Sequence, residues 1–312
     1  MAIFISGSLA YDRIMDFPGH FADHILPDKI HVLNVCFNIN ALVEKFGGTA
    51  GNIAYTLAAL GEKPYIVATS GDDFDNYEEW LNKSQLPMAW IKRISGVLTA
   101  GAYITTDLDD NQITAFNPGA MAYEADLPSL DRGEKEAVVH IAPGNKKDMM
   151  SFAEMARTAG VPYFFDPGQS LNIWQREELR QSVSGALCFI SNDYELSLFL
   201  QMTGWSMATL YKQVQVIITT RGPEGSILDI QGDKLLIPVT PVREVCDPTG
   251  AGDAYRAGLL KGWTMRMDWE TCCQMGSVAA TYAVEHYGTQ EHSLDWREFC
   301  RRYEAQFGSL AC

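Results

Sequence analysis

Apolar runs alternate with stretches of helical periodicity through most of the second half of the chain. Four runs are short, continuous and apolar, which is typical of strands that are buried on both faces of a sheet. They lie at 137–141, 162–165, 187–190 and 214–219. Apolar residues recur at helical spacing near 149–158, 175–183, 194–202 and 269–286. This alternation predicts a parallel sheet covered by helices on both faces, so we expect an α/β fold.

The first half of the chain combines this pattern with segments of a different character. Strands are predicted at 2–6 and 64–69, and helices at 52–60 and 76–84. Two other segments read as short strands and loops, most clearly at 29–37 and in a hairpin at 100–116 that turns at 109–111. We expect residues of about 11–46 and 97–120 to form one small β lid, which excludes water from a site on a single domain spanning 1–312.

Composition and charge narrow the class of protein and its partners. Apolar residues make up 47% of the 312 positions, enough for a large core, and the formal net charge is −15. Because lysine and arginine form no long run, we expect neither nucleic acid nor an anionic membrane as a partner. Segment 1–7 lacks the features of a signal peptide and no apolar run approaches the ~20 residues of a membrane span, so we expect a cytoplasmic protein. The seven cysteines include no Cys-x-x-Cys pair, which predicts free thiols.

The stretch from Val245 to Gly258 carries the clearest chemistry. Strands are predicted at 235–239 and 242–245, and a helix that begins near Gly252 follows them. A helix start made of glycines presents free backbone N–H groups, which together with the helix dipole favour a bound anion. Asp253 beside such a site would repel a phosphate, so taking a proton from an attacking hydroxyl would explain it. The alternative is that Asp253 only complements the dipole of the first helical turn.

Two motifs resemble those of a known family. Asp-Pro-Thr-Gly-Ala-Gly-Asp-Ala-Tyr-Arg-Ala-Gly at 247–258 resembles the C-terminal signature of the ribokinase-like (PfkB) carbohydrate and nucleoside kinases. Gly-Gly-Thr-Ala-Gly-Asn at 47–52 is similar to their N-terminal signature and, with Arg256, is closer to the adenosine-kinase-like branch than to ribokinase. The resemblance extends from Gly7 to about Gln290. It implies an ATP-dependent kinase with a ribokinase-like three-layer α/β/α fold, a central, mostly parallel sheet and a small β lid.

The resemblance assigns roles on the substrate side of the site. Asp253 becomes the general base, and Gly250, Ala251 and Gly252 form the anion hole. Substrate contacts are expected from Asp12, Gly47, Gly48, Asn52 and Phe116. Asp12 would hold the ribose diol, and Phe116 would stack on a base, although an aromatic residue there is otherwise typical of a packed core. The usual Asn two residues before Asp12 is Ala10 here, which removes one expected contact.

The resemblance also assigns a nucleotide side. Asn192 and Glu195 form an Asn-x-x-Glu element, in which Glu195 would hold Mg²⁺ through water; a helix cap explains Asn192 equally well. Nucleotide contacts are expected from Asn192, Thr219, Arg221, Gly222, Gly225, Gly252 and Gly288. The helix at 269–286 and the turn at 287–290 would wall the ATP base. Asp247 and Thr249 fall where related kinases bind a monovalent cation such as K⁺.

Three functions compete. The chain has no Gly-x-x-x-x-Gly-Lys-Ser/Thr loop, no His-Arg-Asp kinase loop and no Gly-x-Gly-x-x-Gly turn at the required place, which disfavours P-loop enzymes and dinucleotide oxidoreductases. We favour a kinase that transfers phosphate from ATP to the 5′-hydroxyl of a nucleoside, adenosine above all, because the lid is apolar where it should face a base. The residues concerned are Val35, Phe37, Ile39, Ala115 and Phe116.

The alternatives are a sugar kinase for ribose, fructose or a similar ligand, and a non-catalytic nucleoside sensor on the same fold. A sensor would need no base, so Asp253 and its flanking glycines disfavour it. The sequence leaves open whether the chain is a monomer or a homodimer joined through the lid.

Overall fold

The computed structural model describes residues 1–26, 31–32, 34–109, 111–130 and 136–310. Its strands are β1 Ala2–Ser6, β2 Ala10–Asp16, β3 Ala41–Gly47, β4 Tyr65–Ser70, β5 Ile91–Arg93, β6 Ala100–Thr106, β7 Gln112–Asn117, β8 Ala137–Ile141, β9 Tyr163–Phe165, β10 Cys188–Asn192, β11 Val216–Thr220, β12 Ser226–Ile230 and β13 Asp233–Ile237. Its α-helices are α1 Phe21–His24, α2 Thr49–Ala59, α3 Asp75–Lys83, α4 Lys146–Ala159, α5 Arg176–Val183, α6 Asp193–Thr203, α7 Met207–Leu210, α8 Ala251–Thr264, α9 Trp269–Val284 and α10 Trp296–Phe307. Short 3-10 helices lie at Gly119–Ala122, Gly168–Ile173 and Gly222–Glu224.

The main sheet has nine strands in the order β13-β12-β11-β10-β9-β8-β1-β4-β5. Neighbouring strands from β11 to β5 are parallel, and β12 and β13 extend one edge in antiparallel fashion. The predicted α/β fold with a mostly parallel central sheet is therefore confirmed. Because the carboxyl ends of parallel strands share one edge, the loops after β1, β9, β10 and β11 open on the same side of the molecule.

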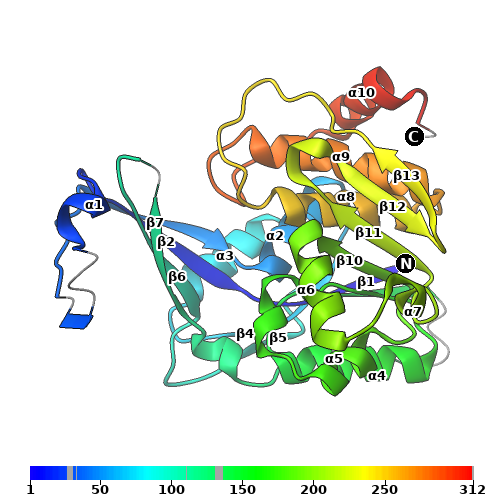
Figure 1. Cartoon of the computed structure of the whole chain (residues 1–312), viewed down its shortest axis with the longest axis horizontal. Coiled ribbons are helices and arrows are strands. Elements are labelled where there is room, and N and C mark those ends of the chain that lie inside the picture. Colours follow the sequence, from blue (N-terminus) through cyan, green and yellow to red (C-terminus); the bar gives the residue numbers. More distant parts are fainter. Residues whose placement is uncertain (27–30, 33, 110, 131–135, 311–312) are drawn as a thin grey trace.

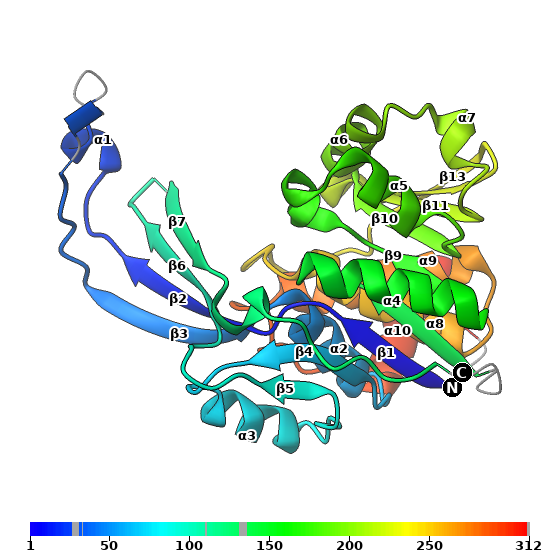
Figure 2. The same ribbon diagram turned by 90° about the horizontal axis from the view of Figure 1, so that it is seen from below.

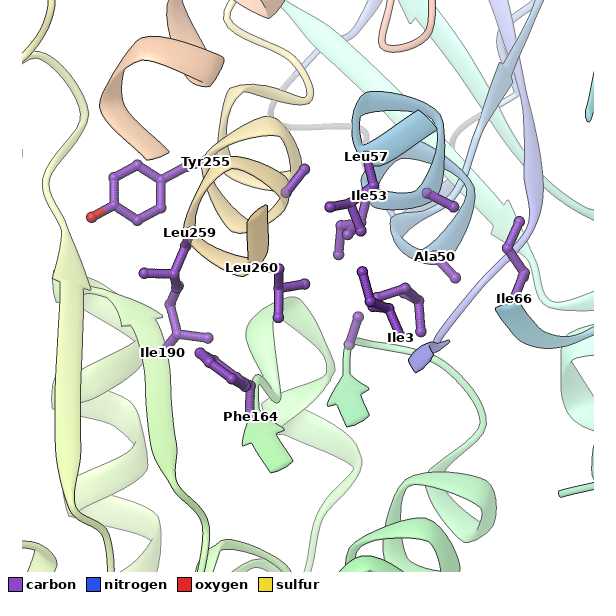
Figure 3. Packing of buried hydrophobic residues seen from close by; sticks show 14 of the residues in the cluster. Ile3, Ala50, Ile53, Leu57, Ile66, Phe164, Ile190, Tyr255, Leu259 and Leu260 are labelled. Carbon is purple, nitrogen blue, oxygen red and sulfur yellow. The ribbon is translucent and has the colours of Figure 1, made fainter. Parts of the chain in front are cut away.

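Helices cover both faces of the main sheet and complete three layers (Figures 1 and 2). On one face, Ile53 and Leu57 of α2 and Leu260 of α8 pack together with Ile3 of β1 (Figure 3). The other face carries α4, α5 and α6 around a second apolar cluster that includes Phe152. These side chains are almost fully buried, and burying each one contributes roughly 1.5–3 kcal/mol. The shared core fixes α2 and α8 against one another.

A smaller sheet of four strands, in the order β3-β2-β6-β7, projects from the body of the molecule (Figures 1 and 2). Strand β2 pairs in parallel with β6, and β3 and β7 form the antiparallel edges. The sheet joins strands from 10–47 and 100–117, the parts of the chain in which the sequence predicts the lid. The hairpin predicted at 100–116 is confirmed as β6 and β7.

Two predicted strands are wrong. The strand expected at 29–37 lies partly outside the described residues. Its described part at 34–37 forms no strand, and β3 begins only at Ala41. Residues 242–245 also form no strand: Val245 is 63% exposed and has no sheet edge to pair with. In both segments the apolar alternation occurs outside a sheet, at positions that are exposed or only partly buried.

The cysteines and helices settle two further expectations. Of the described cysteines, the following are free, as expected: Cys36, Cys188, Cys246, Cys272 and Cys273. Cys300 is instead disulfide-bonded, so the prediction of free thiols throughout is wrong there. Within the described ranges, no helix combines the length and the apolar character needed to span a membrane.

Candidate active site

Helix α8 begins where the sequence predicts an anion site. Its N-cap, Gly250, has a φ of 79°, and a Cβ at this residue would lie 3.0 Å from Thr289 Cγ2. Both the left-handed backbone and the close approach therefore favour glycine. Ala251, Gly252 and Asp253 form the first turn, and among the described residues no side chain caps it. The N–H groups at this end of the helix can accordingly meet an anion at the positive end of the dipole.

Asp253 lies in this first turn and faces the start of α2. Asn52 donates from Nδ2 to Asp253 Oδ2 over 2.8 Å. Burial raises the pKa of Asp253 to about 6, while the charge of Arg256 and the hydrogen bond from Asn52 act in the opposite direction. A carboxylate with a pKa near neutrality that remains ionised at pH 7 is suited to accept a proton.

A buried ion pair between Arg256 and Asp166 holds the first turn of α8 in place. Arg256 donates to both carboxylate oxygens of Asp166, directly after β9, and its Nη1 donates to the Gly252 carbonyl over 2.9 Å. Asp166 is 1% and Arg256 7% exposed. Although burial opposes ionisation, the Arg256 charge keeps the pKa of Asp166 below its usual range. The pair ties α8 to the carboxyl edge of the main sheet.

Asp12 lies on β2, where the small sheet leaves the body. A Cβ on Gly47 would lie 2.3 Å from Asp12 Oδ2, so only glycine leaves room for this carboxylate. Gly48, the N-cap of α2, has a φ of 89° and a Cβ there would lie 2.6 Å from the Ser8 carbonyl. Burial raises the pKa of Asp12 to about 6, and the charge of Asp247 adds to the effect. The Asp12 charge in turn raises the pKa of Asp253, so the two carboxylates lie within electrostatic reach of each other.

The register of the small sheet decides which side chains share a face with Asp12. Asp12 pairs with Ala102, and Ala102 with Phe116, so Phe116 lies on the same face and is 51% exposed. Ala115 falls on the opposite face, because neighbouring residues of a strand alternate, and the expectation that it faces the site is wrong. Phe37 packs instead against Phe17, with ring centroids 4.8 Å apart, near α1.

The predicted nucleotide side collects at the ends of β10 and β11. Asn192 and Glu195 form a reciprocal capping box at the start of α6, in which each backbone N–H donates to the other side chain over 2.7–2.8 Å. Burial raises the pKa of Glu195. Thr219 and Arg221 follow on the neighbouring strand and loop, and Arg221 forms an ion pair with Glu224. The Asn-x-x-Glu element thus has a structural role that its sequence also predicts.

Gly222 and Gly225 shape the loop after β11. Both have a positive φ, 54° and 87°, and a Cβ on Gly225 would lie 2.1 Å from the Ile237 carbonyl. These glycines therefore hold a tight turn against β13, whether or not a nucleotide lies above it.

Asp247 connects the loop before α8 to the turn after α9 by hydrogen bonds. Its Oδ1 accepts from Thr249 N over 2.9 Å, and its Oδ2 from Gly288 N over 3.1 Å. Asp247, Thr249 and Gly288 are therefore brought together, as expected of a cation site. Gln290, expected in the wall of the ATP base, is instead 2% exposed and donates to Asn52 Oδ1 over 3.0 Å.

These elements bring together the start of α8, which has no side-chain cap, the buried carboxylate of Asp253 and the second carboxylate of Asp12. The arrangement can hold a phosphate at the start of α8 while a hydroxyl group lies between it and Asp253. A model of the pfkB family of carbohydrate kinases matches residues 19–297. The chain belongs to this family.

The nucleoside kinases among the similar proteins match almost the whole chain. A nucleoside kinase of Methanothermobacter thermautotrophicus is 32% identical over 307 residues, which cover 96% of this chain and 98% of the relative. The solved structure of a Burkholderia thailandensis nucleoside kinase in complex with inosine is 36% identical, covers 99% of both chains and has a TM-score of 0.86. A further structure of that enzyme holds ADP-inosine. A fructokinase of Salmonella typhimurium is 29% identical over 234 residues, 69% of this chain and 75% of the relative.

Sequence reasoning missed the supports of the candidate site. The sequence places Asp166 directly after a buried strand, at the edge where polar residues of α/β proteins meet ligands, but it does not predict the ion pair of Asp166 with Arg256. Tyr77 and Trp80 were interpreted only as helix residues. Both contact Gln290 from more than 200 positions away, and no local pattern records such a contact.

Proposed function

We propose that the protein is a nucleoside kinase that transfers the γ-phosphate of ATP to the 5′-hydroxyl of a nucleoside, with adenosine preferred. The observation that carries the proposal is the pairing of Asp253, whose pKa burial raises to about 6, with the uncapped start of α8. The nucleoside kinases among the similar proteins support the substrate class, and the ADP-inosine complex supports ATP as the donor.

The residues divide the work of phosphoryl transfer. Asp253 takes the proton of the 5′-hydroxyl while that oxygen attacks the γ-phosphorus. The bond from this phosphorus to the bridging oxygen breaks, ADP leaves with the electron pair, and Asp253 later releases the proton to solvent. Gly250, Ala251 and Gly252 stabilise the charge that develops on the phosphoryl oxygens through the start of α8. Asp12 accepts from two ribose hydroxyls, and Gly47, Gly48 and Asn52 shape the wall beside them.

The nucleotide side would be formed by Asn192, Thr219, Arg221, Gly222, Gly225 and Gly288. The residues present fit a magnesium ion: a carboxylate oxygen can accept further hydrogen bonds, so Glu195 can hold a metal-bound water while Oε2 caps α6. When bound, Mg²⁺ neutralises phosphate charge. Asp247 and Thr249 supply oxygen atoms for a monovalent cation such as K⁺ beside Gly288.

The preference for a nucleoside over a free sugar follows from Phe116, which is exposed on the face of the small sheet that carries Asp12. Stacking a base on an aromatic ring is worth ~1–3 kcal/mol, which a bare sugar cannot recover. A sugar kinase is the second candidate, because the fructokinase relative belongs to the same set of similar proteins.

A side-by-side assay of ATP consumption with adenosine, inosine, ribose and fructose tests the proposal. We expect kcat/KM for adenosine to be at least ~100-fold above that for either sugar, which corresponds to about 2.7 kcal/mol of transition-state binding. Asp253→Asn should lose ~100-fold or more in kcat while retaining ATP binding. A higher kcat/KM for ribose or fructose would replace the nucleoside kinase with the sugar kinase.

A further inference from the structure

A buried hydrogen-bond network leads from α3 to Asn52 and Asp253 through three side chains that have no role in the proposed mechanism: Trp80, Tyr77 and Gln290. Trp80 Nε1 donates to Gln290 Oε1 over 3.0 Å. Gln290 Nε2 donates to Asn52 Oδ1 over 3.0 Å and to the Tyr77 hydroxyl over 2.6 Å. Asn52 Nδ2 then donates to Asp253 Oδ2 over 2.8 Å. Tyr77, Gln290 and Asn52 are 0%, 2% and 5% exposed, so water does not compete for these bonds.

The chemistry of the partners fixes the direction of every bond. An indole Nε1–H can only donate, so the atom of Gln290 that meets Trp80 must be the carbonyl oxygen. The Tyr77 hydroxyl donates its single hydrogen to the Gly47 carbonyl over 2.7 Å, so it can only accept from Gln290. Two independent contacts therefore orient the Gln290 amide with Nε2 towards Asn52.

The same logic carries the orientation to the proposed base. Since Gln290 presents a donor, Asn52 must accept with Oδ1, so its Nδ2–H groups face Asp253. Without this constraint, an asparagine amide could turn by 180° and present its oxygen to the carboxylate. The chain leaves room for the network at Gly51, where a Cβ would lie 2.0 Å from the Tyr77 hydroxyl and 3.0 Å from Gln290 Nε2.

We infer that Gln290 is a positioning residue, which holds the Asn52 amide with its donor towards Asp253 and so keeps the base ionised and aimed. The inference rests on the proposed function only in taking Asp253 as the base. A donor to the ionised carboxylate stabilises that form, and a hydrogen bond to a charged group is worth enough to move its pKa by about one unit. Asn52 acts on Asp253 through its hydrogen bond, and Arg256, Asp166 and Asp12 act on it through their charges. Tyr77 lies within electrostatic reach of it as well.

Two substitutions test the network by different means. Gln290→Met retains the length of the side chain but offers neither donor nor acceptor, so Asn52 is free to turn. Gln290→Glu retains the shape but replaces the donor by an acceptor, which competes with Asp253 for the Asn52 amide hydrogens. Gln201→Met, an exposed glutamine on α6, is the matched control.

The readout is the pKa of the Asp253 carboxyl, followed by NMR in protein with ¹³C-labelled aspartate and assigned with Asp253→Asn. We expect it to rise by about one unit in Gln290→Met, by more in Gln290→Glu, and not at all in the control. The acid limb of the kcat profile should shift by the same amount while KM for ATP is unchanged. This titration needs no turnover, so a wild-type protein that phosphorylates no nucleoside would refute the proposed function and leave this test intact.

A purely structural role for Gln290 gives a different result. It would lower the melting temperature of the variants but leave the pKa of Asp253 at its wild-type value. That outcome in folded Gln290→Met overturns the inference. If Gln290→Met does not fold, the isosteric Gln290→Glu is measured in its place. A pKa of Asp253 that stays at its wild-type value in Gln290→Glu overturns the inference as well.

Discussion

At the scale of single residues, the candidate site brings together two largely buried carboxylates, Asp12 and Asp253. Burial raises the pKa of both Asp12 and Asp253 to about 6. The charge of Asp247 adds to the rise for Asp12, and the charges of Asp166 and Asp12 add to it for Asp253. A base whose pKa lies near the working pH is a better proton acceptor than one at its ordinary value. The same burial costs the folded state stability, because an ionised carboxylate is held where water solvates it poorly.

Asp253→Asn should therefore stabilise the protein in a pH-dependent way. The folded-state pKa of about 6 exceeds the ordinary 3.8, so between these values the folded protein binds more protons than the unfolded chain. The contribution of this group to stability is complete below pH ~4 and is lost as the pH rises through about 6. We expect the variant to exceed wild type by up to about 3 kcal/mol at pH 8 and to gain nothing at pH 4, in urea unfolding at both pH values.

Asp233→Asn, at an exposed position of β13, serves as the control and should change stability little at either pH. Equal stabilisation of Asp253→Asn at pH 4 and pH 8 would contradict the argument, because an effect without pH dependence cannot come from ionisation.

At the scale of elements, the site depends on two helices that start at the same edge of the sheet. Asn52 is in the first turn of α2 and Asp253 in the first turn of α8, and the apolar residues of both helices share one core (Figure 3). The sequence predicts both helices and the chemistry of both starts, because the apolar spacing and the glycines are local patterns. The pairing of the two starts is a long-range contact, which no local pattern records.

The parts that sequence analysis could not predict have the same cause. Val245 lies in an apolar alternation that suits a strand, yet it is exposed and belongs to no strand of the described residues. Gln290 follows a predicted helix and gives no local sign that it meets Asn52 across the molecule. Buried strands such as β8 were predicted to the residue, since continuous burial leaves a continuous apolar run.

The ion pair that anchors α8 to the sheet gives an element-scale prediction. Removing one partner leaves an uncompensated buried charge, so Arg256→Met and Asp166→Asn should each lower the free energy of unfolding by about 3–5 kcal/mol. The double variant should cost less than the sum, because both charges are then absent. Urea unfolding measures all three.

Arg266→Met supplies a matched control for this pair. The Arg266–Glu136 contact joins side chains that are 77% and 71% exposed, and such surface pairs contribute about 1 kcal/mol or less. Additive losses in the double variant would show that Arg256 and Asp166 do not stabilise each other.

At the scale of the whole molecule, the candidate site draws its residues from two sheets. The large sheet and its helices hold the start of α8 with Asp253, whereas the small sheet carries Asp12 and Phe116 and projects beyond the body (Figures 1 and 2). Arg13 of β2 contacts Asp73 of the body, and Lys45 of β3 forms an ion pair with Glu291 over 2.7 Å. Ion pairs from both β2 and β3 thus tie the small sheet to the body beside Asp12.

Shortening the small sheet should uncouple ATP hydrolysis from phosphorylation of the substrate. In the variant, two glycines replace residues 103–115, which removes most of β6 and β7 but retains Asp12 and Phe116. The three apolar core clusters draw their residues from other parts of the chain, so we expect the body to fold. Because a cover excludes water from the γ-phosphate, its loss should let water compete with the nucleoside. The measurement is the ratio of ADP to nucleoside monophosphate formed, expected near one in wild type and well above one in the variant; a ratio that stays near one at full turnover would mean that β6 and β7 do not exclude water.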